Sequence, residues 1–455
     1  MSLGIAAGRS SAVTAELTEL DGRTVALFHL GGGEHRGAIG PAEGETVERL
    51  VGTATDLGVP VIGVLATSGA DIVHGVASLH AWGRLARALT QASGVVPIAF
   101  VVVGPCLSGP ALLLGMADVV VMTAGAFAYV SGPGAVRRFT GREVGHDVLG
   151  GSTVHAVRTG VAWTVADNEE AALETALDAL SYFPSNNHEE PPVRLTADPV
   201  ERDCPVAAAA VPAQANVPYD VRAVIEDVVD EATFLEVRRL HAPNVVTGLA
   251  SVGGHPVGVV ANQPCQMAGT LDVDASSKAA RFVQLCDAFN VPLLTFVDTP
   301  GFQPGKDVEW RGMIRYGAGL VHAYAAATVP RVSVILRKAY GGAYIVMDSR
   351  SLGSDVCFAW PAAEVAVMGA PGAVGILHGK RLAQLEDEAA REAERRALEA
   401  EYAARYCTPA AAAARGLVDE VIEAVGTRRA VAAALAALHT KRERLPHRHH
   451  ANTPL

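Results

Sequence analysis

Two glycine-rich segments in the C-terminal half have the pattern of sites that polarise a carbonyl group with backbone amides. Arg337–Ala343 contains the pair Gly341 and Gly342, and Gly369–Val374 reads Gly-Ala-Pro-Gly-Ala-Val. Each follows an apolar, β-branched run that predicts a buried strand, so each marks a junction between a strand and a helix. Glycine leaves the first N–H groups of a helix uncovered, and the helix dipole adds partial positive charge there. The predicted chemistry is stabilisation of an oxyanion by main-chain N–H groups.

Catalysis by an acidic, basic or nucleophilic side chain is less favoured. His74, His80, His322 and His378 each occur in an apolar or helical context, which favours structural roles. Cys106 has no histidine close in the sequence that would lower its pKa, so a buried, inert thiol is the better interpretation. The six cysteines show no C-x-x-C pair, which excludes a cysteine-rich zinc ribbon, and we expect no metal.

Size and composition favour a protein of two domains. The chain has 455 residues, of which 50% are hydrophobic, so two cores of about 200 residues each can form. The formal net charge of -11 argues against nucleic-acid and anionic-membrane partners, because both require a basic face. Val95–Ala117 lacks charge over the length of a membrane span, but its prolines and glycines predict a buried strand, a turn and a helix instead. No secretion signal is evident, and we expect a cytoplasmic protein.

The two halves of the sequence repeat the same landmarks at nearly the same spacing. The landmarks are Pro60, Pro97, Gly109 and Pro133–Val136 in the first half, and Pro292, Pro330, Gly342 and Pro371–Val374 in the second. Several coincidences nearly in register indicate an internal duplication. The sequence therefore predicts two copies of one α/β unit.

The segment between the copies predicts a connection with little regular structure. Pro184–Asp220 is rich in proline, asparagine and alanine, and we place the domain boundary within it, giving an N-terminal domain 1–205 and a C-terminal domain 206–455. Local patterns predict a hairpin over Ala15–Leu30, strands Val59–Leu65 and Val96–Val103, and helices Glu45–Leu57, Glu169–Leu180 and Asp387–Tyr406. The basic, histidine-rich tail after His439 favours a frayed terminus over a metal site.

Taken together, these motifs resemble the carboxyltransferase (β) subunit of biotin-dependent acyl-CoA carboxylases. The matching segments are Ala261–Pro264, Lys278–Phe282, Val297–Phe302, Ala326–Pro330, Arg337–Ala343 and Val367–Ala370. The resemblance is dense from Tyr219 to Val421 and thinner before it. In the first half, the family's G-P-C-x-G-G is Gly104–Gly109 with a serine at 108, and its S-G-G-A-R is shortened to Ser68–Asp71.

The resemblance implies an α/β fold of tandem crotonase (ClpP-like) domains in a hexamer built from dimers. Acyl-CoA would bind mainly to the N-terminal half, and carboxybiotin to the C-terminal half of a neighbouring subunit. The chain has no lysine in an M-K-M context and no ATP-grasp-like glycine-rich stretch. Biotin is therefore expected on a partner, an α subunit with biotin carboxylase and biotin carrier functions.

The resemblance also assigns roles to particular residues. It implies that Ser108 with Gly109 holds the thioester oxygen and that Gly372 with Ala373 holds the ureido oxygen of biotin, whose freed nitrogen acts as the general base. Further residues expected to bind substrate are Ala70, Gly134, Gly341, Gly342 and Gly375. Gly375 falls where the family tunes acyl length, and its missing side chain favours an acyl group larger than acetyl.

Three functions remain open at this stage. The first is a carboxyltransferase that makes a malonyl- or methylmalonyl-type CoA, and the second is the same subunit in a decarboxylase, running in reverse. The third is a biotin-independent crotonase-type hydrolase or decarboxylase, or a non-catalytic assembly subunit. The altered Ser68–Asp71 and Leu107–Gly109 segments keep the third open, since Ala70 and Asp71 resemble the G-A-D of simple crotonases.

Overall fold

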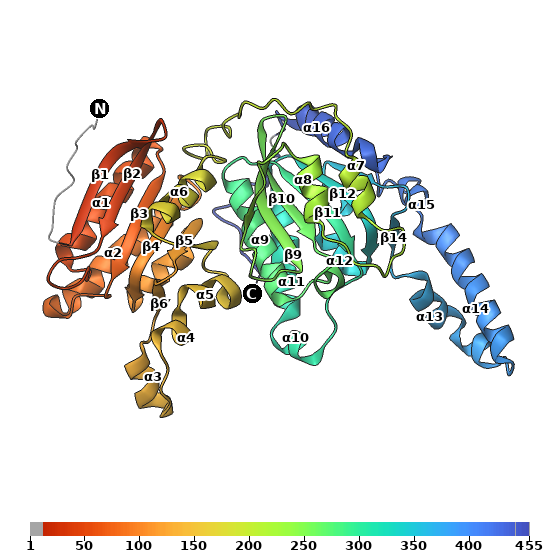
Figure 1. Ribbon diagram of the computed structural model, residues 1–455, viewed down its shortest axis with the longest axis horizontal. Coiled ribbons are helices and arrows are strands. Elements are labelled where there is room, and N and C mark those ends of the chain that lie inside the picture. Colours follow the sequence, from red (N-terminus) through yellow and green to blue (C-terminus); the bar gives the residue numbers. More distant parts are fainter. Residues whose placement is uncertain (1–11, 442, 455) are drawn as a thin grey trace. The chain divides into compact units, whose positions relative to one another are not determined.

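The computed structural model describes residues 12–441 and 443–454, and these divide into two compact units. The first comprises the chain up to Pro192 together with Val237–His241 and Ala288–Asn290, and the second comprises Val193–Glu236, Ala242–Asp287 and the chain from Val291. Each unit has its own sheet and its own helices (Figure 1). We describe each unit by itself.

Among its described residues, the first unit contains a seven-stranded sheet in the order β1-β2-β3-β4-β5-β7, with β6 paired to β4. Its strands are β1 (Val13–Leu20), β2 (Arg23–Leu30), β3 (Val61–Thr67), β4 (Ile98–Leu107), β5 (Val119–Thr123), β6 (Phe127–Tyr129) and β7 (Thr164–Ala166). Its helices are α1 (Pro41–Leu57), η1 (Ile72–His74), α2 (Val76–Ala92), η2 (Gly109–Met116), α3 (Pro133–Thr140), α4 (His146–Gly150), α5 (Ser152–Val154), η3 (His155–Thr159) and α6 (Glu169–Leu180). The β1–β2 hairpin is antiparallel, and β2 to β5 pair in parallel.

The described residues of the second unit form an eight-stranded sheet in the order β15-β13-β12-β11-β10-β9-β8, with β14 paired to β12. Its strands are β8 (Leu235–Val237), β9 (Val245–Val252), β10 (His255–Asn262), β11 (Leu293–Thr299), β12 (Arg331–Tyr340), β13 (Val356–Ala359), β14 (Glu364–Ala366) and β15 (Glu420–Val421). The helices that precede β13 are α7 (Pro205–Ala210), α8 (Arg222–Val228), η4 (Met267–Gly269), α9 (Val273–Ala288), α10 (Lys306–Trp310), α11 (Met313–Ala326), α12 (Gly341–Val346) and η5 (Arg350–Leu352). Those that follow β14 are α13 (Ala370–Ala383), α14 (Glu388–Tyr402), η6 (Ala403–Cys407), α15 (Pro409–Ala413), η7 (Ala424–Gly426) and α16 (Thr427–Leu438).

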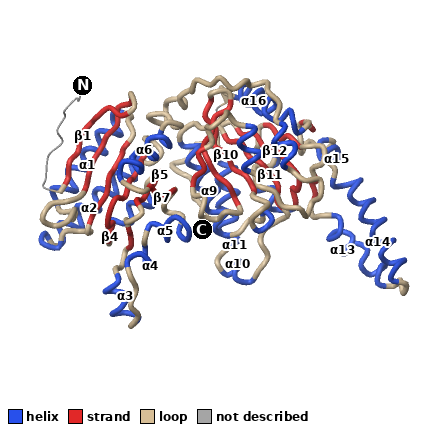
Figure 2. The backbone as a smooth tube through the Cα atoms, in the orientation of Figure 1, coloured by secondary structure: helices blue, strands red, loops and turns tan. Residues whose placement is uncertain are grey.

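Burial on both faces of the parallel strands explains their apolar, β-branched sequences. β3 reads Val-Ile-Gly-Val-Leu-Ala-Thr and β11 reads Leu-Leu-Thr-Phe-Val-Asp-Thr, and nearly every side chain in them is buried. Helices cover the faces of each sheet, as the blue segments beside the red strands in Figure 2 show. This two-sided cover is typical of parallel sheets in α/β proteins.

The two units repeat one topology, which confirms the predicted duplication. Each sheet contains an antiparallel hairpin ahead of its parallel strands, β1–β2 in the first and β9–β10 in the second, where the short strand β8 pairs outside β9. The parallel strands that follow then correspond in order. The register of the central pair, β3–β4 in the first unit and β11–β12 in the second, shifts near the carboxyl ends of these strands. The short strands β6 and β14 take equivalent places, because each adds to the carboxyl end of the central strand.

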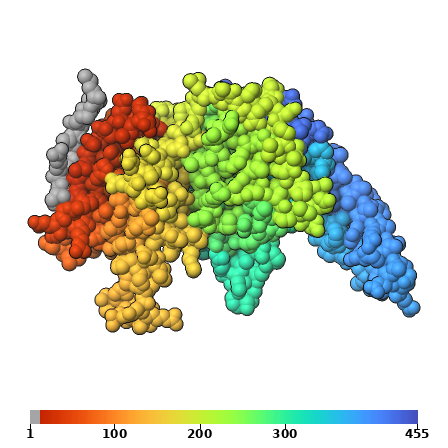
Figure 3. Space-filling view, in the orientation of Figure 1, coloured from red at the N-terminus to blue at the C-terminus, as the bar shows by residue number. Residues whose placement is uncertain are grey.

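Most predicted elements are present with shifted ends. Helix α6 has the predicted bounds, whereas α1 begins at Pro41, ahead of the predicted Glu45, because the side chain of Glu43 accepts the N–H of Gly40 and caps the extra turn. The predicted charged helix is present as α14, which continues as the π-helix η6, and its residues project from the rest of the second unit (Figure 3). Val95–Ala117 folds as strand β4 and the 3₁₀-helix η2. In the described parts of the chain, no helix combines the length and apolar character needed to cross a membrane.

The compact units divide after Pro192, whereas the sequence places the domain boundary after residue 205. The stretch 193–205 packs with the second unit, since the N–H of Arg194 donates to the Gly254 carbonyl (2.8 Å) and the Arg428 guanidinium donates to the Pro199 carbonyl (3.0 Å). The boundary of the functional domains stays a prediction.

Candidate active site

The segments that follow β3 and β4 meet at the carboxyl edge of the first sheet. Thr67 pairs with Cys106 at the end of this ladder. Beyond it, a methyl group placed on Gly69 would lie 3.1 Å from both the Leu107 carbonyl oxygen and the Ser108 Cβ, so the two segments are in contact. In parallel α/β sheets this edge is where ligands bind.

Ala70 presents its backbone N–H at this edge. The loop before α1 forms a bridge here, in which the N–H of Ile39 donates to the Gly69 carbonyl (2.8 Å) and the N–H of Asp71 donates to the Ile39 carbonyl (3.0 Å). Neither bond uses the N–H of Ala70, because alternate residues of a strand point their amides to opposite sides.

Gly109 presents a second amide, and Ser108 does not. The N–H of Ser108 donates to the Tyr129 carbonyl (2.9 Å) and so belongs to the β4–β6 ladder. Gly109 is the first residue of η2, where an N–H has no acceptor within the helix. Of the predicted pair, Gly109 is thus placed to receive an oxyanion, and Ala70 lies on the adjoining segment.

Only glycine fits at position 109. A Cβ built there would lie 2.9 Å from the indole ring of Trp82, closer than real contacts allow. Ser108 before it has φ +63° and ψ −146°, a conformation that is almost confined to glycine. Cys106 is buried, as the sequence interpretation expects, and burial raises the pKa of its thiol to about 12, which favours an inert residue.

The second unit repeats this arrangement. Thr299 pairs with Ala339, the N–H of Leu271 donates to the Gly301 carbonyl (3.2 Å), and the N–H of Gln303 donates to the Leu271 carbonyl (2.8 Å). Phe302 therefore takes the place of Ala70. Gly341 has φ +60°, like Ser108, and Gly342 takes the place of Gly109.

Gly341 and Gly342 line a mainly apolar pocket of about 440 Å³ that lies within the second unit. Tyr344, Tyr402 and Tyr406 are also in its wall. The Tyr344 side chain is 5% exposed, and its hydroxyl has no hydrogen-bond partner among the described residues.

The Pro-Gly-Ala-Val segments open α3 and α13. In α13 the N–H of Ala373 donates to the Gly369 carbonyl (3.1 Å), so Gly372, one residue earlier, is the member of that predicted pair whose amide has no acceptor within the helix. Gly134 holds the second position of α3. A Cβ on Gly375 would meet nothing within 4 Å.

A buried ion pair lies beside the strand-end turn of the second unit, the turn at Gly341 and Gly342. The sequence interpretation did not identify this ion pair. The Asp298 carboxylate lies 3.0 Å from Arg337 Nε, and its other oxygen accepts the backbone N–H of Lys338 (3.2 Å). Arg337 also donates to the carbonyls of Gln214 (2.9 Å) and Val217 (2.8 Å). The pair thus joins β11, β12 and the connecting segment. The V-D-T-P-G and R-K-A-Y-G-G motifs were the available signal.

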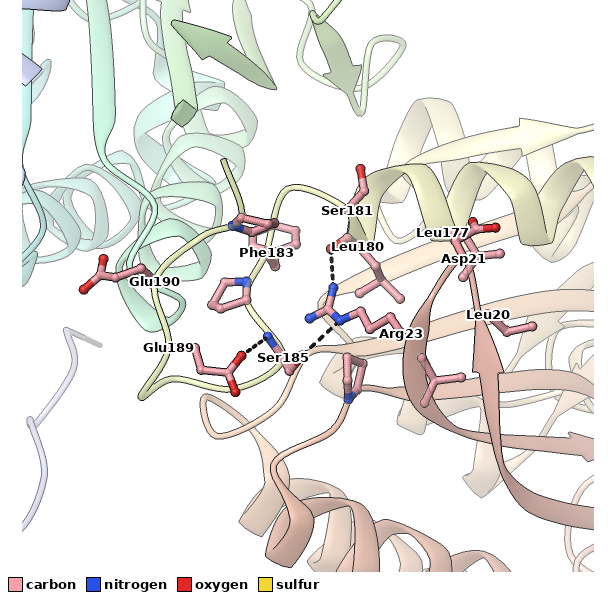
Figure 4. Close-up of a pocket in the computed structure, with 14 residues that line it drawn as sticks. Leu20, Asp21, Arg23, Leu177, Leu180, Ser181, Phe183, Ser185, Glu189 and Glu190 are labelled. Carbon is pink, nitrogen blue, oxygen red and sulfur yellow. Dashed lines mark hydrogen bonds between the residues drawn. The ribbon is translucent and has the colours of Figure 1, made fainter. Parts of the chain in front are cut away.

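A further pocket of about 330 Å³ lies at the opposite edge of the first sheet (Figure 4). Arg23, the first residue of β2, donates there to the Leu180 carbonyl (2.8 Å) and the Ser185 hydroxyl (3.1 Å). Burial lowers the pKa of Arg23, and Glu189 opposes that effect. Because this pocket lies at the amino ends of the strands, we assign it no part in catalysis.

Comparison with known proteins agrees with this geometry. The carboxyl transferase domain model matches residues 4–453. The propionyl-CoA carboxylase carboxyltransferase subunit of Haloferax mediterranei is 44% identical over 438 residues, covering 96% of this chain and 84% of that protein. The methylmalonyl-CoA decarboxylase subunit alpha of Veillonella parvula is 39% identical over 437 residues, again covering 96% and 84%.

A solved structure extends the comparison to three dimensions. Transcarboxylase 12S, with methylmalonyl-coenzyme A and methylmalonic acid bound, superimposes with a TM-score of 0.94 and 39% identity, covering 98% of this chain and 85% of that one. Because the likeness spans nearly the whole chain and both strand-end turns, the protein belongs to the carboxyl transferase family, as a carboxyltransferase subunit of the biotin-dependent acyl-CoA carboxylase type.

Proposed function

We propose that this subunit transfers a carboxyl group between carboxybiotin on a partner protein and the α-carbon of a short acyl-CoA. The observation that carries the proposal is the pair of equivalent strand-end turns, one per unit, that present backbone amides at the carboxyl edge of each sheet. Both reacting groups are carbonyl compounds whose oxygens gain negative charge in the reaction. Preorganised N–H donors stabilise such charge, and each is worth about 3 kcal/mol.

The first unit holds the thioester. The amides of Ala70 and Gly109 donate to the thioester oxygen as the α-carbon becomes an enolate. This assignment refines the expected pair, because the N–H of Ser108 is already bonded to Tyr129. The exposed apolar side chains of Ile72 and Val73 next to Asp71 provide a surface for the pantetheine arm.

The second unit holds the ureido ring of biotin. The ureido ring is small enough for the pocket of about 440 Å³ beside Gly341 and Gly342. Carboxybiotin, when bound, supplies the carboxyl group and a ring nitrogen that takes up the α-proton. The amides of Gly342 and Gly372 donate to the ureido oxygen and so stabilise biotin as a leaving group.

The proposed roles of the two units imply which protein partners the chain has. We infer that a biotin carboxylase and biotin carrier α subunit delivers the carboxyl group. The hexamer assembly described for transcarboxylase 12S supports a hexamer, a trimer of dimers, for this chain. The open space at Gly375 supports an acyl group larger than acetyl, and we expect a cytoplasmic enzyme.

The test is the half-reaction of the purified chain with methylmalonyl-CoA or malonyl-CoA and free biotin. We expect propionyl-CoA or acetyl-CoA to form only when biotin is present. Gly109→Ala should lower kcat/KM about 100-fold, because its methyl group would collide with Trp82 and displace the amide.

Gly83→Ala is the matched control for this half-reaction, since a methyl group there meets nothing within 4 Å. Its kcat/KM should equal that of the wild type. Product formation without biotin, or full activity of Gly109→Ala, would contradict the proposal. The ratio of the rates with the two thioesters identifies the preferred acyl group.

A further inference from the structure

Two histidines share one buried carboxylate directly beside the proposed thioester site. Asp71 follows Ala70 in the chain and is 5% exposed. Its Oδ2 lies 2.7 Å from Nδ1 of His35 and 3.1 Å from Nδ1 of His74, while its Oδ1 accepts the N–H of Val73 (2.9 Å). The N–H of Val73, followed by the two histidines, holds the pKa of Asp71 below its ordinary value.

This geometry sets the protonation pattern of both rings. An ionised carboxylate only accepts hydrogen bonds, so each Nδ1 that bonds to it must carry a proton. In the neutral rings, Nε2 then has the free electron pair and can act as a base. An aspartate that orients a histidine in this way is the arrangement used for general acid–base catalysis.

The backbone holds His35 against the site. The N–H of Ser68 donates to the Arg36 carbonyl (3.1 Å), and the Ser68 hydroxyl donates to the His35 carbonyl (2.8 Å). Together with the bridge between Ile39 and Ala70, these bonds bind the loop along residues 68–71. The side chains of His35 and His74 are 45% and 51% exposed, so solvent can exchange protons with both rings.

We propose that His35 and His74, oriented by Asp71, exchange the α-proton of a bound acyl-CoA with solvent in the absence of biotin. This inference rests on the proposed binding of the thioester at Ala70 and Gly109. The α C–H bond breaks, its proton moves to Nε2, and the electron pair forms an enolate whose oxygen the two amides stabilise. The imidazolium exchanges its proton with water and returns one to the α-carbon, so no further reactant is consumed.

The alternative is a structural role, in which the cluster only holds the loop that carries His35 against residues 68–71. Substitutions distinguish the two roles. If the role is structural, they weaken thioester binding or folding, whereas if the histidines act as bases, they lower the exchange rate at saturating thioester. Removal of a general base costs about 100-fold or more in rate.

The experiment measures deuterium uptake at the α-carbon of propionyl-CoA in D₂O by mass spectrometry, without biotin, and thioester binding by calorimetry. The variants are His35→Gln with His74→Gln, and Asp71→Asn, which keeps an acceptor for the Val73 N–H but loses the charge. We expect wild-type exchange, a loss of about 100-fold in the double variant and a smaller loss in Asp71→Asn, all with thioester binding retained. The control His80→Gln removes an exposed histidine of α2 and should exchange at the wild-type rate.

The outcomes separate this inference from the proposed function. Thioester binding without exchange in the wild type, or wild-type exchange in the double variant, overturns the inference alone. Absence of thioester binding overturns both the inference and the proposed acyl-CoA site.

Discussion

At the scale of single residues, the site depends on backbone conformations that only some side chains allow. Ser108 and Gly341 occupy equivalent turns with φ +63° and +60°. Glycine adopts this conformation freely, whereas a serine there stores strain of about 1–3 kcal/mol. The first unit thus carries strain at its turn that the second unit avoids.

Ser108→Gly should therefore stabilise the protein by about 1 kcal/mol, after allowance for the greater freedom of glycine in the unfolded chain. The reciprocal variant Gly341→Ser should destabilise it, since a Cβ there also lies 3.1 Å from the Val367 carbonyl. The midpoint of urea unfolding measures both changes. A lower midpoint for Ser108→Gly would mean that contacts of the serine side chain outweigh the strain.

Asp348 links stability to pH. Burial raises its pKa from 3.8 to about 6 in the folded protein, even though Arg331 lies 2.9 Å away. Its second oxygen is buried and has no hydrogen-bond partner in the part of the chain that is described. The folded state therefore binds a proton more tightly than the unfolded state, so this contribution is full below 3.8 and is lost as the pH rises to about 6. The unfolding free energy of the wild type minus that of Asp348→Asn, measured across this window, should fall as the pH rises.

At the scale of elements, the parallel strands position both turns at the carboxyl edges of the sheets. The register slip at the end of each central strand pair frees the following segment from the ladder, and both turns open there. The units differ in what supports the turn. The second uses the buried pair Asp298 and Arg337, whereas the first has Ala66 at the position equivalent to Asp298.

We expect Asp298 to position the biotin side. Asp298→Ala leaves Arg337 buried without its partner and should cost about 3–5 kcal/mol of stability. The double variant Asp298→Leu with Arg337→Met restores an apolar fit and should recover much of that stability. If the pair positions the turn, the double variant stays folded yet has a raised KM for free biotin in the half-reaction. A wild-type KM would limit the pair to a structural role.

At the scale of the whole molecule, duplication provides two similar strand-end turns, which in the proposed function serve two different carbonyl groups. The turns have equivalent bridges and equivalent glycines, but their walls differ, with Trp82 beside Gly109 and the tyrosine-lined pocket beside Gly342. Under the proposed function, one duplicated geometry would stabilise both the enolate and the leaving biotin.

The proposed thioester site and the proposed biotin site should be separable by substitution. Gly372→Pro removes one N–H at the start of α13, where proline is tolerated in the first helical turn. It should lower carboxyl transfer to free biotin about 100-fold while propionyl-CoA still binds, as calorimetry can measure. Gly379→Ala, further along the same helix, keeps its N–H, meets nothing within 4 Å and serves as the control. Transfer at the wild-type rate in Gly372→Pro would refute its part in the site.

The sequence alone determined the duplication, the strands and the glycine turns, because apolar periodicity and glycine spacing are local properties of the chain. It also indicated Gly109 and Gly372, since an uncovered amide at a helix start depends on residues close in sequence. Only the tertiary structure decided that the Ser108 and Ala373 amides are already bonded, because their acceptors depend on how strands pair and where a helix begins. The tertiary structure also decided the contacts of Asp71 with His35 and of Asp298 with Arg337. The partners in each contact are far apart in the sequence and meet only when the chain folds.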